Sequence, residues 1–384
     1  MSAIERFHRS DRLNDAINHR SLTIQTPEDS MTVNLYEAHQ QWASRPADER
    51  FSSLEDLAAH VRARRDGSRE EVVNVRDLHV AVEGEHGMGL NHHHPTALFT
   101  HWAFGQLCTT IVAPARYLRT LPAELAGDCL RQGLSRSTEK CRILYRNFEE
   151  GFAGNGMLQT AALTGPSYGR IWDSEVIAAL QKAVSGSSWH VPESKHDLPS
   201  GLYASDRDMF AFMVSDEPPI EVGNAKLGRG FFIWNSETGA STFGLTTFLY
   251  NYVCGNHIVW GAEEINELRI VHREKAPDRY YREAVPFLNR FVESRSLTDS
   301  VSETVYRAMR ERIGVSVEDV LKWFAQKPFS KREITEAFTI GQSEGDDPTT
   351  LWGIVQGLTA YARHFKHIDS RVDLERRTGS LLAL

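Results

Sequence analysis

The feature that most constrains the fold is residues 228–261, GRGFFIWNSETGASTFGLTTFLYNYVCGNHIVWG. Among its 34 residues, Arg229 and Glu237 are the only ones of Asp, Glu, Lys or Arg type, and it has one histidine, His257. An extended chain at residues 231–234 would be apolar on both faces, which is typical of a strand covered on both sides. The stretch therefore predicts the interior of a folded domain.

A polar turn interrupts this apolar stretch. Asn235-Ser-Glu-Thr-Gly239 has the composition of a hairpin turn that closes on a left-handed glycine. The partner segment, residues 241–254, fits both a strand and one face of a helix. Its Thr, Tyr, Phe and Val residues favour a strand. The hairpin is thus the predicted centre of the core, and its polar turn is the edge at which we expect function.

The remaining patterns are divided between strands and helices. Alternating apolar residues predict strands or hairpins, whereas apolar residues at helical spacing and capping boxes at Ser316 and Ser330 predict helices. Asp173 or Ser174 is expected to cap one further helix. The strands are expected at residues 70–87, 206–216 and 267–273, and the helices at 53–65, over most of 96–134 and after 276. The sequence predicts an α+β fold with a central, mostly antiparallel sheet, flanking helices and a helical C-terminal third.

Three regions are expected along the chain. Residues 1–50 are polar and lack a clear apolar face, which predicts a flexible or loosely docked N-terminal arm. Residues 51–275 contain the predicted strands and form the α+β core. Residues 276–384 form a helical region that packs on this core.

Composition limits the class of protein. A chain of 384 residues with 41% hydrophobic residues can bury a sizeable core. The net charge of −8 argues against a surface coated in positive charge, but a local basic groove needs only clustered Lys and Arg. The four cysteines lie far apart without a C-x-x-C pair, so neither a zinc ribbon nor a disulfide scaffold is expected. Without an apolar leader or a run of about 18 apolar residues, we expect a cytoplasmic protein that does not enter a membrane.

Three adjacent histidines, His92, His93 and His94, with His101 nearby, have the residue type that binds zinc most often. Consecutive side chains point in different directions, so adjacent histidines rarely close one site, and we expect a polar loop. The sequence also lacks a Walker A loop, a G-x-G-x-x-G after a strand and a G-x-S-x-G elbow. We therefore expect no metal and no cofactor.

Basic and aromatic residues occur together at several predicted corners. They would supply cations for phosphates and π surfaces for bases, as binding of a single-stranded nucleic acid requires. Arg and Trp at strand ends also make ordinary ion pairs and core contacts, so the pattern is not specific. The candidate nucleic-acid-binding residues are Arg119, Tyr168, Arg170, Arg207, Arg229, Trp234, Arg269 and Arg273.

A second candidate set is polar. Asn235, Glu237, Asn256, His257 and His272 lie near the ends of predicted strands. If they converge at one end of the sheet, the carboxylate and imidazoles would suit acid–base chemistry. Periodicity does not place them together, so an enzyme stays one of several alternatives.

Several stretches together resemble a known family. The stretches are THWAFGQLCTTIVAPARYLRTLPAELAGDCLRQGL (100–134), LTGPSYGRIWDSEVIAAL (163–180), GRGFFIWNSETGAST (228–242) with YVCGNH (252–257), and TTLWGIVQGLTAYARH (349–364). In the same order, over about residues 75–380, they resemble the DUF932 family of phage/plasmid-like proteins. Asn235–Gly239 keeps the family's Asn-Ser-Glu-x-Gly, whereas His257 stands where the family often has Gly. The resemblance implies a gene carried by phages, plasmids or integrated elements, and it implies no reaction.

Three hypotheses follow, in this order. The first is an accessory protein of a phage, plasmid or prophage that binds or anneals single-stranded DNA as a homo-oligomer. The second is a protein without chemistry that assembles with itself or binds a host or phage protein. For the second, Trp352, Val355, Leu358 and Tyr361 could form an interface on one helix face, although a core helix has the same pattern. The third is an enzyme that uses the polar set.

Overall fold

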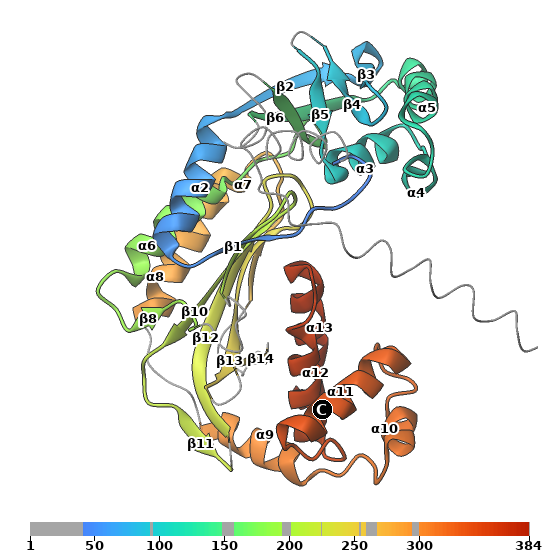
Figure 1. Cartoon of the computed structure of the whole chain (residues 1–384). Helices are drawn as coiled ribbons and strands as arrows, with labels where there is room; N and C mark the ends of the chain where they lie inside the picture. The colour runs from blue at the N-terminus through green and yellow to red at the C-terminus, as the bar shows by residue number, and fades with distance from the viewer. Residues whose placement is uncertain are drawn as a thin grey trace, which may run out of the picture.

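The computed structural model describes residues 41–92, 95–147, 157–193, 201–223, 225–252, 255–258, 267–293 and 299–383. Over these residues the fold is α+β with a helical C-terminal region, as the sequence predicts (Figure 1). The strands form two sheets, one of nine strands and one of six, where the sequence led us to expect one central sheet. We call them sheet A and sheet B.

Sheet A is antiparallel at every pairing in its described part. Its main path runs β1-β9-β10-β12-β13-β14, with β8 beside β10, β11 beside β12 and β15 beside β13. The strands are β1 Glu49–Phe51, β8 Trp189–His190, β9 Leu202–Ala204, β10 Met209–Ser215, β11 Ile220–Val222, β12 Ala225–Asn235, β13 Phe243–Asn251, β14 Asn256–Ile258 and β15 Leu268–Ile270. β1 begins within residues 1–50, the expected arm, of which residues 1–40 lie outside the described residues.

Sheet B forms a second layered unit with its own core. Its order is β2-β6-β7-β5-β4-β3, and β5 pairs with β7 in parallel. The elements are β2 Ser68–Asn74, η1 Val75–Asp77, β3 His79–Glu83, β4 Gly87–Asn91, β5 Ala97–Phe99, α3 His101–Thr110, α4 Ala115–Leu118, α5 Ala123–Arg136, β6 Lys140–Asn147 and β7 Leu158–Thr164. Apolar side chains of α3, α4 and α5 share one buried cluster with those of the sheet.

Helices cover both faces of sheet A (Figure 1). One face packs against α2, α6 and α8, and the other faces the C-terminal helices. The helices are α2 Leu54–Asp66, α6 Asp173–Val184, α7 Ala276–Arg279, η2 Tyr280–Ala284, α8 Val285–Glu293, α9 Asp299–Arg310, α10 Val317–Trp323, α11 Lys331–Glu344, α12 Leu351–Ala362, α13 Ile368–Ser380 and η3 Leu381–Ala383. The proposed interface face of α12 packs into the core of the C-terminal helices, because Trp352, Val355 and Leu358 are buried there and the partly buried Tyr361 packs against them.

The predicted central hairpin is confirmed. β12 and β13 pair from Leu227 to Trp234, so residues 243–251 are a strand and not a helix. Phe231 and Ile233 pack toward α2, α6 and α8, while Phe232 and Trp234 pack toward α13. The strand is therefore covered on both faces, which explains its continuous apolar sequence.

Local signals set several helix ends. Ser53 accepts a hydrogen bond from the Asp56 backbone N–H at the start of α2, and Ser330 with Glu333 forms a full capping box on α11. The expected capping of α6 by Asp173 or Ser174 is wrong, because Trp172 occupies the cap position and its side chain makes no capping hydrogen bond with the described residues. The Asp173 carboxylate instead accepts a bond from Asn235, in sheet A.

Residues 41–51 connect the N-terminal side of the fold to the C-terminal helix. Trp42 is buried and donates to the His86 carbonyl, in sheet B. Arg45 pairs with Asp369 at 2.9 Å, and the Asp48 carboxylate accepts a bond from the Ile368 backbone N–H at 2.5 Å. We call this pair of contacts the terminal clasp.

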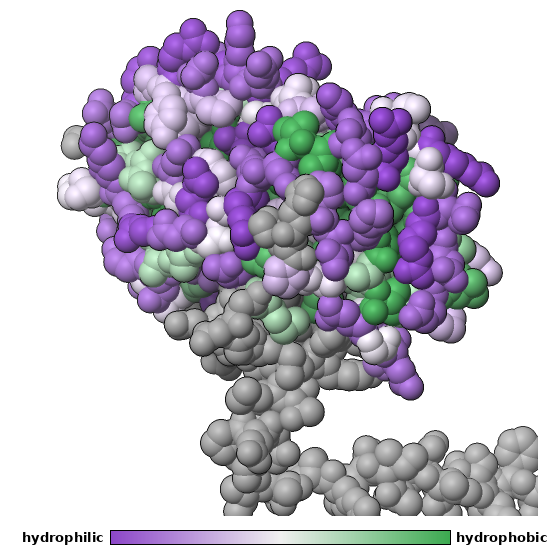
Figure 2. Space-filling view, turned by 90° about the horizontal axis from the view of Figure 1, so that it is seen from above, coloured by the Kyte–Doolittle hydropathy of each residue, from purple (hydrophilic) through white to green (hydrophobic). Residues whose placement is uncertain are grey.

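The surface at the sheet B end is mainly hydrophilic, with separate hydrophobic spots (Figure 2). Exposed large hydrophobic residues of this unit include Val72, Val112, Tyr117 and Leu125. Within the described ranges, each helix is too short or too polar to cross a lipid bilayer.

Candidate nucleic-acid interface at the junction of the sheets

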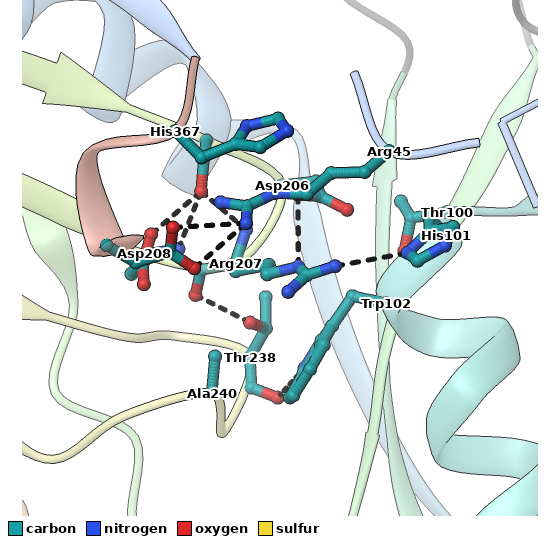
Figure 3. A network of polar contacts seen from close by, with 12 residues as sticks. Arg45, Thr100, His101, Trp102, Asp206, Arg207, Asp208, Thr238, Ala240 and His367 are labelled. Atoms are coloured by element: carbon teal, nitrogen blue, oxygen red, sulfur yellow. Dashed lines mark hydrogen bonds and ion pairs between the residues drawn. The ribbon is translucent and has the colours of Figure 1, made fainter. Parts of the chain in front are cut away.

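The tip of the β9–β10 hairpin lies at the junction of the two sheets (Figure 3). Ser205 and Asp208 close the turn, because the Ser205 hydroxyl donates to the Asp208 carboxylate at 2.9 Å and accepts from its backbone N–H. Burial raises the pKa of Asp208 to about 7, and the charge of Asp369 adds to the shift. The turn therefore holds Asp206 and Arg207 in a fixed position between the sheets.

The polar turn that follows β12 is buried at the same junction. Gly239 has φ of 84°, the left-handed conformation expected from the sequence. The Thr238 carbonyl accepts bonds from Trp102 at 3.0 Å and Gln106 at 2.7 Å, both on α3. The hydroxyls of Ser236 and Thr238 donate to the Arg207 carbonyl. The turn thus connects sheet A to α3 instead of facing solvent.

Glu237 in this turn holds the start of α6. Its carboxylate pairs with Arg146 of β6 and accepts the Asp173 backbone N–H at 2.7 Å. A carboxylate here satisfies an unpaired helix N–H and opposes the positive end of the helix dipole. Burial, and then the charge of Glu237, raise the pKa of Asp173 well above its usual value. Asn235 donates to Asp173 at 2.7 Å, which joins the turn directly to the start of α6.

An open groove lies beside this junction, between α3, the turn after β7 and the turn after β12. Its volume is about 610 Å³. Three of the eight predicted nucleic-acid-binding residues line it, namely Arg119, Tyr168 and Arg207. The remaining lining residues are His101, Trp102, Gly105, Gln106, Thr109, Thr110, Ala115, Leu163, Thr164, Gly165 and Gly239. We call it the α3 groove.

The charge of the α3 groove is positive. Arg119 and Arg207 are its cations, and none of the described residues that line it is acidic. Burial, together with the charges of Arg119 and Arg207, lowers the pKa of His101 to about 4. His101 is therefore neutral near pH 7, and its Nδ1 accepts a bond from Arg207 at 3.1 Å. The Arg207 guanidinium lies 4.9 Å from the ring centroid of Trp102, so a cation and an aromatic ring share one wall.

Trp102 is a functional candidate that sequence reasoning missed, and so is Asp206. The available signal for Trp102 was its position one residue after His101, at the start of a predicted helix. For Asp206 it was the polar Ser205-Asp-Arg-Asp208 turn between two apolar strands. Neither signal distinguishes a site residue from an ordinary turn or core residue.

The other five predicted nucleic-acid-binding residues are not among the residues that line the α3 groove, although the Arg170 guanidinium lies 5.1 Å from the ring centroid of Tyr168. Arg170 and Arg229 are buried in ion pairs with Glu70 and Glu217. Trp234 is buried under Arg376, whose guanidinium lies 4.3 Å from one of its ring centroids. Arg269 and Arg273 are exposed, and Arg269 pairs with Glu267 at 2.8 Å.

The polar candidate set is divided between the two ends of β13. His272 lies near Asn235 and Glu237, because its ring stacks on Tyr168 at 5.0 Å and the Tyr168 hydroxyl donates to the Ser236 carbonyl. Asn256 and His257 pair in β14 with the opposite end of β13, at Asn251 and Tyr250. His257 is buried there, with Arg371 donating to its Nδ1 at 3.1 Å. The five residues therefore do not converge.

The described part of the histidine run is not arranged as a metal site. His92 lies 3.2 Å from the Asp77 carbonyl, while His93 and His94 lie outside the described residues. Among the residues that the structure describes, His, Cys, Asp and Glu side chains form no group of three that could hold a metal ion. Cys108, Cys129 and Cys141 are free thiols, and Cys254 is outside the described residues.

Comparison with known proteins gives a single family. Neither the curated proteins nor the solved structures contain a significant match. The family described as "Domain of unknown function (DUF932)" matches residues 162–381, which is more than half of the chain. This range holds sheet A from β8 onward, α6 and the C-terminal helices, whereas α3 and most of sheet B precede it. The chain belongs to the DUF932 family.

Proposed function

We propose that this protein binds single-stranded nucleic acid in the α3 groove. The observation that carries the proposal is that Arg119, Tyr168 and Arg207, which were selected from sequence for this role, line one open groove beside Trp102. The groove joins cationic side chains to aromatic ones and has no acidic residue among its described lining. This is the chemistry that phosphates and unpaired bases require.

Arg119 and Arg207 are the expected phosphate contacts. Both guanidinium groups are held in place, Arg119 by the carbonyls of Trp42 and His101 and Arg207 by the ring of His101. Held side chains lose little further conformational freedom when they bind a phosphate. A planar guanidinium and an indole also offer stacking surfaces for bases, and the Arg207–Trp102 pair supplies both in one wall.

A role as an accessory protein of a mobile genetic element accompanies this proposal. It rests on the phage/plasmid association implied by the sequence resemblance. Assembly into an oligomer would align several such grooves along one strand and raise the overall affinity. Light scattering that gives a monomer at high concentration would remove the assembly from the proposal and leave the groove untouched.

Fluorescence anisotropy with labelled oligothymidylate and with a duplex, over a salt series, tests the proposal. We expect tighter binding to the single strand. A plot of the logarithm of the binding constant against the logarithm of the salt concentration should have a slope of about −0.7 for each phosphate contact. Arg207→Gln and Arg119→Gln should each reduce that slope by roughly one contact. Trp102→Leu should weaken binding without changing the slope, because stacking contributes about 1–3 kcal/mol and releases no counterion.

Arg332→Gln is the matched control. Arg332 is an exposed arginine on α11, in the C-terminal helical region. The same loss of one positive charge at this position should leave the affinity and its salt slope unchanged. Affinity of the unaltered protein that does not depend on salt, or an equal loss in the control, would contradict binding through the α3 groove.

A further inference from the structure

A second, smaller cavity adjoins the α3 groove and differs from it in chemistry. Its volume is about 120 Å³, whereas one buried water needs roughly 10–15 Å³, so it has room for a group of several heavy atoms. The start of α3, the end of β6 and the tip of the β9–β10 hairpin contribute to its wall. Its lining includes Thr100, His101, Arg146, Ser205 and Asp206. We call it the inter-sheet cavity.

Asp206 carries a buried carboxylate that accepts no hydrogen bond from the described residues. Its side chain is 8% exposed, and within the described residues neither carboxylate oxygen has a hydrogen-bond partner. Arg207 Nε lies 3.7 Å from one carboxylate oxygen, which is longer than a hydrogen bond. Burying a carboxylate without such bonds is unfavourable, and a ligand that donates two N–H groups would satisfy both oxygens.

Arg146 supplies a donor in the same cavity. Its Nη2 pairs with Glu237, but its buried Nε has no hydrogen-bond partner in the described structure. Two further polar groups of the lining, the Gln159 amide and the Ser205 hydroxyl, donate hydrogen bonds within the protein. Among the described lining residues, the buried side-chain atoms without a hydrogen-bond partner are the two carboxylate oxygens of Asp206 and the Nε of Arg146.

The Watson–Crick edge of guanine has the complementary pattern. It presents the 2-amino and N1–H groups as adjacent donors, followed by the O6 acceptor. Adenine and cytosine each present one donor group, and thymine presents one N–H between two acceptors. A bidentate contact between a carboxylate and the two guanine donors would satisfy both Asp206 oxygens, while O6 accepts from Arg146.

The inter-sheet cavity and the α3 groove meet at His101, which lines both. Arg207 lines the groove and the adjacent Asp206 lines the cavity, and the Arg207–His101 hydrogen bond stands between them (Figure 3). A base turned out of a strand in the groove would meet this contact first. Recognition of a turned-out base by its Watson–Crick edge in an enclosed pocket is an established way to read a single nucleotide.

We propose that the inter-sheet cavity receives a guanine base, whose N1–H and 2-amino groups donate to Asp206 and whose O6 accepts from Arg146. This inference rests on the proposed function, since the base would come from a strand bound in the α3 groove. It adds base preference to a groove that by itself reads only phosphates and stacking surfaces.

The test compares labelled oligothymidylate with the same strand carrying one central guanine or one central hypoxanthine. Hypoxanthine keeps N1–H and O6 and lacks the 2-amino group. We expect the guanine strand to bind roughly tenfold more tightly than oligothymidylate, and the hypoxanthine strand to lie between them. In Asp206→Asn the ratio of the two affinities should fall to about one, because an amide offers one acceptor in place of two. Asp278→Asn, at an exposed position of α7, is the control and should keep the ratio.

A second measurement does not require strand binding. GMP, IMP and AMP are compared for their effect on the melting temperature of the full chain. GMP should raise it most, and Asp206→Asn should remove that difference. If oligothymidylate binds with the expected salt dependence and guanine gives no preference, the cavity proposal is overturned while the groove proposal stands. If no strand binds, the groove proposal fails, and equal effects of the three nucleotides would then overturn the guanine site as well.

Discussion

Arg146 and Glu237 form a buried ion pair between the two sheets, although 91 residues separate them in the chain. The same Glu237 side chain accepts the first backbone N–H of α6. One carboxylate therefore fixes sheet B, sheet A and a helix relative to one another, and the cavity and the groove lie beside it.

Glu237→Gln should lower the free energy of unfolding by at least about 3 kcal/mol, because it leaves the Arg146 guanidinium buried without its counter-charge. Urea denaturation measures the change. Glu221→Gln is the control, since Glu221 pairs with Lys226 at the surface and should change stability by about 1 kcal/mol or less. The combined variant Arg146→Met with Glu237→Gln should recover part of the loss. If Glu237→Gln lowered the stability no more than the control Glu221→Gln, the buried pair would not be what joins the sheets.

His272 should make folding sensitive to acid. Burial is the main reason that its pKa is lowered to about 4, so below about pH 6.5 the unfolded chain takes up a proton that the folded protein does not. Its contribution is complete above pH 6.5 and is lost as the pH falls toward 4, by about 3 kcal/mol. His272→Gln should reduce the difference in stability between pH 6.5 and 4.5, measured by urea denaturation at each pH, and His101 should keep part of it because its pKa is also lowered to about 4. His79→Gln, on the exposed side of β3, should leave the slope as it is.

Gly357 is a point of close approach between α11 and α12. A Cβ atom there would lie 2.1 Å from the Ala337 carbonyl oxygen, a backbone atom that cannot rotate away. Gly357→Ala should therefore destabilise the protein by about 1–3 kcal/mol, even though Ala is the better helix former. Gly341→Ala on α11 meets nothing closer than 3.4 Å and should be neutral or stabilising. Thermal unfolding of both variants decides, and a stable Gly357→Ala would mean that the two helices can separate slightly.

The capping box of α11 should be measurable by itself. Ser330 accepts the Glu333 backbone N–H at 3.2 Å, and the Glu333 carboxylate accepts the Ser330 N–H at 2.6 Å. Ser330→Ala should lower the free energy of unfolding by about 1 kcal/mol. Ser343→Ala, at an exposed position of the same helix, should change it by less than about 0.5 kcal/mol. A similar loss in both variants would attribute the effect to helix composition and not to the cap.

Local structure was the part of the fold that sequence could predict. Ser53 and Ser330 begin helices, and the polar turn closes on Gly239, because caps and turns depend on residues close together in the chain. The central hairpin followed from apolar residues on both faces of residues 231–234. These signals require no knowledge of distant partners.

Strand partners were beyond such reasoning. Alternation predicts a strand near residue 80 but does not say that it joins a second sheet, with β5 and β7 parallel. β1 at residues 49–51 pairs with β9, more than 150 residues later, and has no periodic pattern of its own. Pairing of this kind depends on burial across the whole fold.

The candidate site was predicted in part for the same reason. Arg119, Tyr168 and Arg207 lie around one groove, whereas Arg170 is buried by Glu70, a partner 100 residues away. The local sequence around an arginine does not show whether its side chain pairs with a buried carboxylate or faces solvent. Asp206 became a candidate only through its burial and because no described residue donates a hydrogen bond to its carboxylate.

The terminal clasp has a consequence for the order in which the protein is completed. Residues 46 and 47 form part of the wall of the inter-sheet cavity, and their neighbours Arg45 and Asp48 contact partners 324 and 320 residues later in the chain. At a synthesis rate of roughly 5–20 residues per second, the partners of Arg45 and Asp48 are therefore synthesised about 15 seconds to a minute after residues 45–48. A translation product that stops before α13 lacks those partners, so the cavity acquires its complete wall only in chains that were translated through α13.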